Sequence, residues 1–428
     1  MLKFRKLLLA AFALVLTLAA AAQVTTSSIT GTVKDKNGAP LEGATITATH
    51  LPSGTVYNAI SRRGGVFNIT NARIGGPYRL RVEFVGQQPF QTEGFTLLLG
   101  EPFDINVQMG EDVKQITEVV VTGGRRTGAA EKTGTSTNIN QRLLTTIPTI
   151  SRSISNFTAL TPQANGTSFA GRDNRMNNVQ IDGANLNNNF GLSSDLLPGG
   201  NNQPISLDAV EEVAVNVSPF DVWQGGFTGA GVNVVTKSGT NTFKGSAYYL
   251  FRSEKMNGTK IGGTTLTNLA EQSNNIWGFT LGGPIIKNKL FFFASYEREE
   301  ESRPGITVTP RGGSGQGNIS NTPIDSLRKL ANHLISRYGY DPGAFDNFPN
   351  FQTKNYKLLG KIDWNINKMH KLTLRYQETI GTDDRPLNGT SIPNVSPFTP
   401  AGASQSITSL PNSRFGVNSM AFSNSNYY

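Results

Sequence analysis

From residue 243 onward, the chain repeatedly alternates apolar or aromatic residues with polar ones. The pattern recurs in FKGSAYYLF, IWGFTLG, YKLLGKIDW and KLTLRYQ, which begin at positions 243, 276, 356 and 371. One face of each stretch collects the large side chains, such as Tyr249, Trp277 and Trp364. Because successive side chains of a strand point to opposite faces, this period of two predicts β-strands with one apolar face. Aromatic residues near strand ends are typical of a wall with lipid outside and water inside.

The connections between these strands carry more information, because a soluble sandwich would also alternate. Short connections fall at 287–289 and 365–369, and long ones at 253–274, 299–355 and 381–411. Strict alternation of short and long connections is typical of outer-membrane barrels, with periplasmic turns and extracellular loops. The spacing therefore predicts strands of a transmembrane β-barrel.

The longest connection contains a helical pattern. Within IDSLRKLANHLISRY, Leu327, Leu330, Leu334 and Ile335 recur at the period of an α-helix. We expect a helix over Ile324–Tyr338.

Five or six strands fit between residues 243 and 428. A closed bacterial barrel needs at least about 8 strands, and a large plugged transporter about 22. An open barrel edge in lipid would leave backbone groups without hydrogen-bond partners. We therefore expect residues 241–428 to be the first part of a barrel and the chain to be an N-terminal fragment.

The first 22 residues read as a secretory signal peptide. Lys3, Arg5 and Lys6 precede an apolar run over 7–18, and the small residues 20–22 offer a cleavage site before Gln23. The chain has 0 cysteines, which excludes a disulfide framework and a thiolate metal site. The prediction is an exported protein.

Composition fits a secreted β protein, with 37% hydrophobic and 16% charged residues. No later stretch reaches the ~18 apolar residues of a transmembrane helix. The net charge is +9, but the basic residues are scattered rather than gathered on one face. We expect no binding to nucleic acid.

Residues 23–110 contain short alternating runs separated by turn signals, such as Asn37-Gly38 and 63–65. This spacing predicts an all-β sandwich. The opening GTVKDKNGAPLEGATI and the later GGVFNI resemble the carboxypeptidase-regulatory-like domain. The resemblance implies that fold and no peptidase activity.

Residues 111–240 differ in composition and are rich in asparagine between 172 and 190. Such a patch is often disordered, but here it brackets a short strand over 179–181 and an Asp182-Gly183 turn. Since Asn tolerates left-handed turns and both donates and accepts hydrogen bonds, ordered polar loops are the preferred interpretation.

Three further motifs carry a longer resemblance. They are IDGA at 181–184, VEEVAVNVSPFDV at 210–222 and GFTGAGVNVVTKSGTN at 226–241. This text resembles the end of the plug domain of TonB-dependent outer-membrane receptors, in the Oar-like branch. The resemblance implies a mainly β chain: an N-terminal β-sandwich, an α+β plug domain over 111–240, and the first strands of a transmembrane β-barrel.

The resemblance also implies a grip for a TonB-type energy transducer between the sandwich and the plug. Our candidate TonB box consists of Glu118, Val119, Val120, Val121 and Thr122. β-branched residues keep such a segment extended, so it could add as a strand to the partner. The alternative is that TEVVVTGG is only the first strand of the plug.

The predicted function is an outer-membrane TonB-dependent receptor that takes up an unknown ligand, with the transducer and outer-membrane lipid as partners. The alternative is a surface-displayed adhesin, or an export or structural barrel protein without active uptake. The three plug-like motifs favour the receptor, because an adhesin does not need a plug domain in its lumen.

We expect no enzyme, cofactor or metal site. His50, His333 and His370 lie in three different segments and are interpreted as surface or loop residues. HExxH and GxSxG motifs are absent from the sequence, and the glycine-rich run 312–317 is interpreted as a loop.

Overall fold

The computed structural model describes residues 25–110, 135–149, 152–187, 203–219, 224–261, 264–265, 271–304, 308–314, 318–347, 350–367, 370–385 and 421–427. These residues belong to two compact units, and each is described by itself. The first unit takes in 1–187 and 210–237, and the second takes in 188–209 and 238–428. The expected signal peptide lies outside the described residues.

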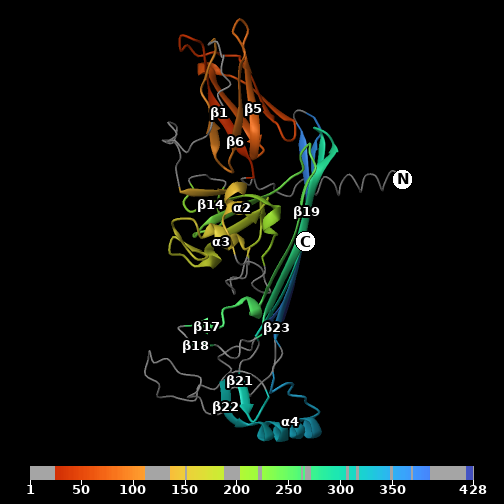
Figure 1. Cartoon of the computed structure of the whole chain (residues 1–428). Coiled ribbons are helices and arrows are strands. Elements are labelled where there is room, and N and C mark those ends of the chain that lie inside the picture. The colour runs from red at the N-terminus through yellow and green to blue at the C-terminus, as the bar shows by residue number, and fades with distance from the viewer. Residues whose placement is uncertain are drawn as a thin grey trace, which may run out of the picture. The chain divides into compact units, whose positions relative to one another are not determined.

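The first unit begins with eight strands in two sheets (Figure 1). One sheet has the order β4-β1-β7, with β8 also paired to β1; the other has the order β3-β2-β5-β6. The strands are β1 (Ser27–Lys34), β2 (Thr45–His50), β3 (Thr55–Ile60), β4 (Val66–Ala72), β5 (Gly75–Glu83), β6 (Phe90–Leu97), β7 (Pro102–Asp104) and β8 (Val107–Gln108), with a short 3-10 turn η1 (Arg63–Gly65) before β4. The apolar faces of both sheets share one buried core, so this part is a sandwich.

Alternation explains the sandwich core. Ile29 and Val33 on β1 and Ile46 and Leu80 on the other sheet are fully buried. Gly31 lies between the two β1 residues because a Cβ at this position would sit 1.8 Å from the carbonyl oxygen of Ile105. The glycine of the GTVKD motif therefore permits a close approach between neighbouring backbones.

The middle segment (residues 135–187 and 210–237) is the rest of the first unit, and it contains a five-stranded sheet with the order β13-β12-β15-β14-β9. Its strands are β9 (Ser136–Asn140), β12 (Asn178–Ile181), β13 (Ala184–Asn185), β14 (Val210–Asn216) and β15 (Gly231–Thr236), accompanied by the small pair β10 (Ala164–Asn165) and β11 (Ser168–Phe169). Two short helices, α2 (Gln141–Thr146) and α3 (Ile154–Thr158), and the 3-10 turn η3 (Asn174–Met176) complete it; a further 3-10 turn, η4 (Leu207–Ala209), belongs to the second unit. The segment therefore combines short helices with a sheet that contains both parallel and antiparallel strand pairs.

The predicted Asp-Gly turn joins β12 to β13. Asp182 and Gly183 both have positive φ, 43° and 86°, which these two residue types tolerate best. The described asparagines nearby form hydrogen bonds: Asn187 Nδ2 donates to Asn178 Oδ1 over 2.9 Å, and Asn177 Oδ1 accepts from the Ala230 N–H. The prediction of ordered polar loops is confirmed for these residues.

The second unit is dominated by a six-stranded antiparallel sheet with the order β16-β19-β20-β23-β24-β25. The strands are β16 (Lys244–Ser253), β19 (Ser273–Ile286), β20 (Leu290–Arg303), β23 (Phe351–Asn365), β24 (Lys371–Arg385) and β25 (Ala421–Tyr427). Its long strands run side by side in Figure 1. The number of strands agrees with the prediction from the sequence.

One face of this sheet is apolar and exposed, as the alternation predicts. Its exposed members are Phe243, Tyr249, Phe251, Trp277, Phe279, Leu281, Leu358, Ile362, Trp364, Leu372, Leu374 and Tyr376. The opposite face carries the polar residues, of which Thr280, Ser295, Glu297, Asn355, Lys357, Lys361, Thr379 and Asp383 are buried. It also buries five apolar residues: Ile276, Phe291, Phe293, Phe351 and Leu359. This division fits a wall between lipid and an aqueous lumen.

The connections follow the predicted order. Short connections join β19 to β20 and β23 to β24, and Asn288 takes the left-handed conformation, with a φ of 61°, in the first of them. The long connections carry η5 (Glu254–Met256), β17 (Lys260–Ile261), β18 (Thr264–Thr265), β21 (Val308–Arg311), β22 (Asn318–Pro323) and α4 (Ile324–Tyr338). Among the described residues, no helix is both long enough and apolar enough to cross a membrane.

The strand ends and the buried side of one helix differ from the sequence expectations. Strand β23 begins at Phe351 rather than after Asn355, and β24 continues to Arg385 rather than ending near Gly381. Strand β20 continues to Arg303 instead of ending near Glu299, because the hydrogen-bonded ladder extends past the apolar band and Arg303 forms an ion pair with Asp383 on β24. Helix α4 has the predicted bounds but buries Ile324, Leu327 and Ala331. Two apolar stripes at helical spacing overlap in this sequence, and the helix buries the one that contains Ile324 and Ala331. Leu330 belongs to the other stripe and is exposed.

Unfolding of the excised segment 23–110, with and without substitutions at Tyr78, tests whether this segment folds on its own. The Tyr78 ring is fully buried, stacks on Phe95 with 5.7 Å between ring centroids, and its hydroxyl donates to the Arg73 carbonyl over 2.6 Å. We expect the excised segment to unfold cooperatively in urea. Tyr78→Ala should lower its free energy of unfolding by about 3–5 kcal/mol, and Tyr78→Phe by about 1–2 kcal/mol.

The matched control is Val85→Ala, because Val85 is 95% exposed. This change should alter the free energy of unfolding by less than about 0.5 kcal/mol. A broad, non-cooperative transition of the unmodified segment would show that the domain boundary is wrong.

Candidate functional site

A short chain segment lies against the polar face of the six-stranded sheet. Residues 203–209, which precede β14 and include η4, belong to the same compact unit as that sheet. Ile205 and Ser206 are buried. The wall cluster consists of Pro204 and Ser206, the residues of β16, β20 and β24 that they contact, and Lys357 on β23, which contacts Glu297. Its members are Pro204, Ser206, Tyr248, Glu297, Lys357, Gln377 and Thr379.

Cross-strand register brings the charged members of the wall cluster together. Glu297 on β20 is directly opposite Lys357 on β23, and the Lys357 Nζ lies 2.6 Å from the Glu297 Oε1. A second carboxylate, that of Glu299, lies 3.8 Å from the same ammonium group. Both side chains of the closer pair are almost fully buried, so this is a buried ion pair.

A glycine allows Tyr248 to join the pair from two strands away. Gly278 on β19 is opposite both Tyr248 on β16 and Glu297 on β20. A Cβ at Gly278 would lie 2.5 Å from the Tyr248 hydroxyl oxygen. The tyrosine side chain therefore passes over Gly278, and its hydroxyl donates to the Glu297 Oε2 over 2.5 Å.

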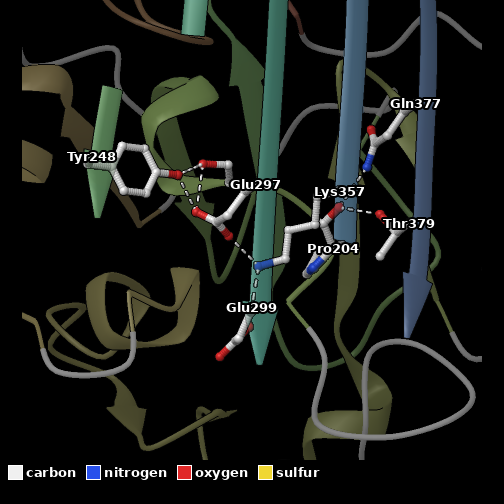
Figure 2. Close-up of polar contacts among 8 residues, drawn as sticks. Pro204, Tyr248, Glu297, Glu299, Lys357, Gln377 and Thr379 are labelled. Carbon is white, nitrogen blue, oxygen red and sulfur yellow. Dashed lines mark hydrogen bonds and ion pairs between the residues drawn. The ribbon is translucent and has the colours of Figure 1, made fainter. Parts of the chain in front are cut away.

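Glu297 is the centre of the cluster (Figure 2). Its carboxylate accepts from the Ser206 hydroxyl over 2.9 Å, from Tyr248 and from Lys357. The Ser206 and Tyr248 hydroxyl oxygens lie 2.9 Å apart. With three donors, one of them a cation, the buried carboxylate is fully compensated.

The backbone of the segment is held by a third strand. The Pro204 carbonyl accepts hydrogen bonds from Gln377 Nε2 over 2.9 Å and from Thr379 Oγ1 over 2.8 Å, both on β24 (Figure 2). Pro204 has no N–H, so its carbonyl is its only backbone hydrogen-bonding group. The segment is thus fixed through one carbonyl and one hydroxyl.

This arrangement holds a segment and exposes no reacting group. Ser206 and Glu297 resemble a nucleophile and its base, but both are buried, at 2% and 4% exposure. Lys357 is engaged by carboxylates. Within the described ranges, no group of three or more His, Cys, Asp or Glu side chains is arranged to hold a metal ion.

The predictions for the candidate TonB box and for the three histidines compare differently with the structure. Glu118, Val119, Val120, Val121 and Thr122 lie outside the described residues. His333 and His370 are exposed, as expected. The interpretation of His50 as a surface or loop residue is wrong: it ends β2, is 3% exposed, and its Nδ1 lies 2.6 Å from the Ser53 Oγ. The ring is buried because it packs against Tyr78 in the sandwich.

Sequence reasoning did not find the wall cluster. Alternation in YKLLGKIDW puts Lys357 on the face opposite Trp364, but the partner of Lys357 depends on the β20–β23 register, which alternation alone does not fix. The signal that could have indicated it is a row of charged residues at inward positions of a membrane strand, where each charge needs a partner.

Comparisons with known proteins identify two domains. Residues 235–425 match the outer membrane beta barrel domain, and residues 28–110 match the carboxypeptidase regulatory-like domain. These matches confirm the sandwich and barrel resemblances proposed from the sequence.

A curated relative matches most of the chain. The TonB-dependent transporter Oar of Myxococcus xanthus is 25% identical over 384 residues, which cover 84% of this chain and 34% of the relative. The chain thus spans about a third of the length of that protein.

Two solved structures are also similar. The siderophore receptor PirA from Acinetobacter baumannii has a TM-score of 0.39 at 16% identity, covering 58% of this chain and 32% of that one. The outer membrane transporter YddB from Escherichia coli has a TM-score of 0.40 at 13% identity, covering 58% and 33%.

The barrel domain and the transporter relative place the chain in the outer membrane of Gram-negative bacteria. Transporters of this kind are not enzymes, in agreement with the prediction. The chain is therefore a homologue of the TonB-dependent transporter Oar, with a carboxypeptidase regulatory-like domain ahead of an outer membrane beta barrel domain.

Proposed function

We propose that this chain belongs to an outer-membrane receptor that takes up a ligand with energy supplied by a TonB-type transducer. The homology to a TonB-dependent transporter supports the general class. The alternative, an adhesin or a structural barrel without active uptake, requires no segment held on the luminal face.

The observation that carries the proposal is the wall cluster. Residues 203–209 lie on the polar face of the sheet and are held there by Glu297, Tyr248 and β24. A receptor needs such a segment, because its lumen must be closed between transport events. We infer that residues 111–240 are the plug and that 203–209 is where the plug attaches to the wall.

The chemistry of the attachment suits a plug. Hydrogen bonds between a segment and a water-facing wall can be exchanged for bonds to water when the segment moves. The buried Glu297–Lys357 pair fixes the position of the Glu297 carboxylate but adds little net stability, because desolvation offsets much of its Coulomb attraction. Such contacts fix a register without making it permanent.

The proposed site for the transducer is Glu118–Thr122. In sequence it follows the sandwich and precedes β9, so a partner that grips it would pull on the start of the middle segment. Strand addition relies on main-chain hydrogen bonds, with alternate side chains giving specificity. Consecutive β-branched residues favour the extended conformation that this requires.

Val120→Pro tests the proposed box. Proline removes one N–H donor and restricts Val119, so strand addition should fail. We expect the purified receptor carrying Val120→Pro to bind the periplasmic domain of the TonB-type transducer at least about tenfold more weakly, as the loss of ~1.4 kcal/mol implies.

Val120→Thr is the matched control, because it keeps β-branching and the donor; its affinity should stay within about twofold. Both variants should insert into the outer membrane normally. Unchanged transducer binding by Val120→Pro would show that the box lies elsewhere in the chain.

A double-mutant cycle tests the wall cluster. Lys357→Met leaves the Glu297 carboxylate buried without its cation, and this should destabilise the full receptor by about 3–5 kcal/mol. Adding Glu297→Gln removes the uncompensated charge and should recover most of the loss. The readout is the midpoint of thermal unfolding in detergent.

Arg79→Met serves as the control for this cycle. Arg79 pairs with Glu93 on the surface of the sandwich, where both side chains are partly exposed to water, so its removal should leave the unfolding midpoint almost unchanged. Additive effects of Lys357→Met and Glu297→Gln would contradict the coupling on which the cluster depends.

A further inference from the structure

A second attachment lies within the first unit, between the sandwich and the sheet of the middle segment. Leu99 follows β6 in the sandwich, and its N–H donates to the Glu212 Oε1 on β14 over 3.0 Å. Its carbonyl accepts from the Asn138 Nδ2 on β9, also over 3.0 Å. Two neighbouring strands therefore hold both backbone groups of one sandwich residue.

The side chain of Leu99 completes the contact. Leu99 packs with Ile74 of the sandwich and with Ala214 and Val235 of the middle sheet in a separate buried apolar cluster. All four are at least nine-tenths buried. This contact surface therefore has an apolar centre next to two backbone hydrogen bonds, as in a specific interface.

Glu212 is the unusual member, because it is a carboxylic acid that is 3% exposed. Burial raises its pKa to about 7, against the lowering effect of the Leu99 hydrogen bond. Glu101 of the sandwich and Glu211 on the same strand raise the pKa further, since both are negative. The other two strands packed beside it, β9 and β15, contain no charged residue.

The backbone at this point directs both acids toward the sandwich. The pairing of β14 with β15 is irregular between Val210 and Glu212, so Glu211 is an extra residue in the ladder. The Glu211 Oε1 lies 3.4 Å from the position that a Cβ on Gly75 would take. Ionised Glu212 would therefore share this contact surface with two further carboxylates, those of Glu101 and Glu211.

We propose that Glu212 and Leu99 form a proton-linked latch, which holds the sandwich on the middle sheet when Glu212 is protonated and weakens when it ionises. The latch goes beyond the proposed uptake function and does not depend on it. It controls whether the sandwich stays docked on the sheet that contains β9, the first described strand after the proposed box.

The direction of the pH effect follows from the raised pKa. Docking is strongest below the ordinary pKa of a glutamic acid, 4.5, where Glu212 is protonated in both docked and released states. Between that value and about 7 the docked state binds the proton more tightly, so the docking constant falls roughly tenfold per pH unit. Above pH 7 it levels off.

This chain has 0 cysteines, so the latch can be tested on the full receptor in detergent once any cysteine in the rest of the receptor is replaced by serine. Ala214→Cys places a thiol inside the latch, where a maleimide reacts after release; Val85→Cys places one at a 95% exposed site. The ratio of the two labelling rates removes the intrinsic pH dependence of the thiol. We expect this ratio to rise several tens of fold between pH 5 and pH 7.

Two variants decide the origin of that rise. Glu212→Gln keeps the acceptor for Leu99 but cannot ionise, so the ratio should stay low and flat. Glu101→Gln removes one neighbouring charge, so the ratio should level off at a lower pH. A flat profile in the parent chain, or an equal rise in Glu212→Gln, would overturn the latch. If Glu212→Gln fails to fold, an unshifted profile in Glu101→Gln overturns it instead.

Discussion

The structure depends on one constraint: backbone N–H and C=O groups that face lipid must find partners within the protein. The constraint selects long antiparallel strands, and it makes every side chain on a strand either lipid-facing or lumen-facing. Alternation then places Trp277, Phe279 and Leu281 on the exposed face and Glu297 and Lys357 on the other. The polar cluster on the wall is thus a consequence of the same pairing that makes the wall.

A polar wall changes what can be attached to it. An apolar lumen would hold a plug through buried area alone, which is not directional and fixes no register. A wall with Glu297 between two hydroxyls and an ammonium group accepts one arrangement of donors. Gly278 is part of this specificity, because any side chain there would meet the Tyr248 hydroxyl. Small and charged residues at inward positions therefore act together.

Much of this fold could be predicted from the sequence, because the relevant patterns are local. The period of two predicts which face of the sheet is exposed, and the helical spacing predicts the bounds of α4. The Asp182-Gly183 pair predicts the turn between β12 and β13. What could not be predicted depends on pairing between distant segments. The Glu297–Lys357 pair needs the β20–β23 register, and the Leu99–Glu212 contact joins residues 113 positions apart. His50 was misjudged for the same reason, since Tyr78 covers it from another strand.

The two attachments lie close together along the chain although they belong to different units. Ser206 is held by the wall, whereas Glu212 holds the sandwich, and the chain passes from one unit to the other between Ala209 and Val210. Within the first unit, a displacement of the sandwich reaches β14 through Leu99 while the latch is closed, and it does not when the latch is open. Proton binding at Glu212 would therefore decide whether the sandwich and β14 respond to a pull as one body or as two.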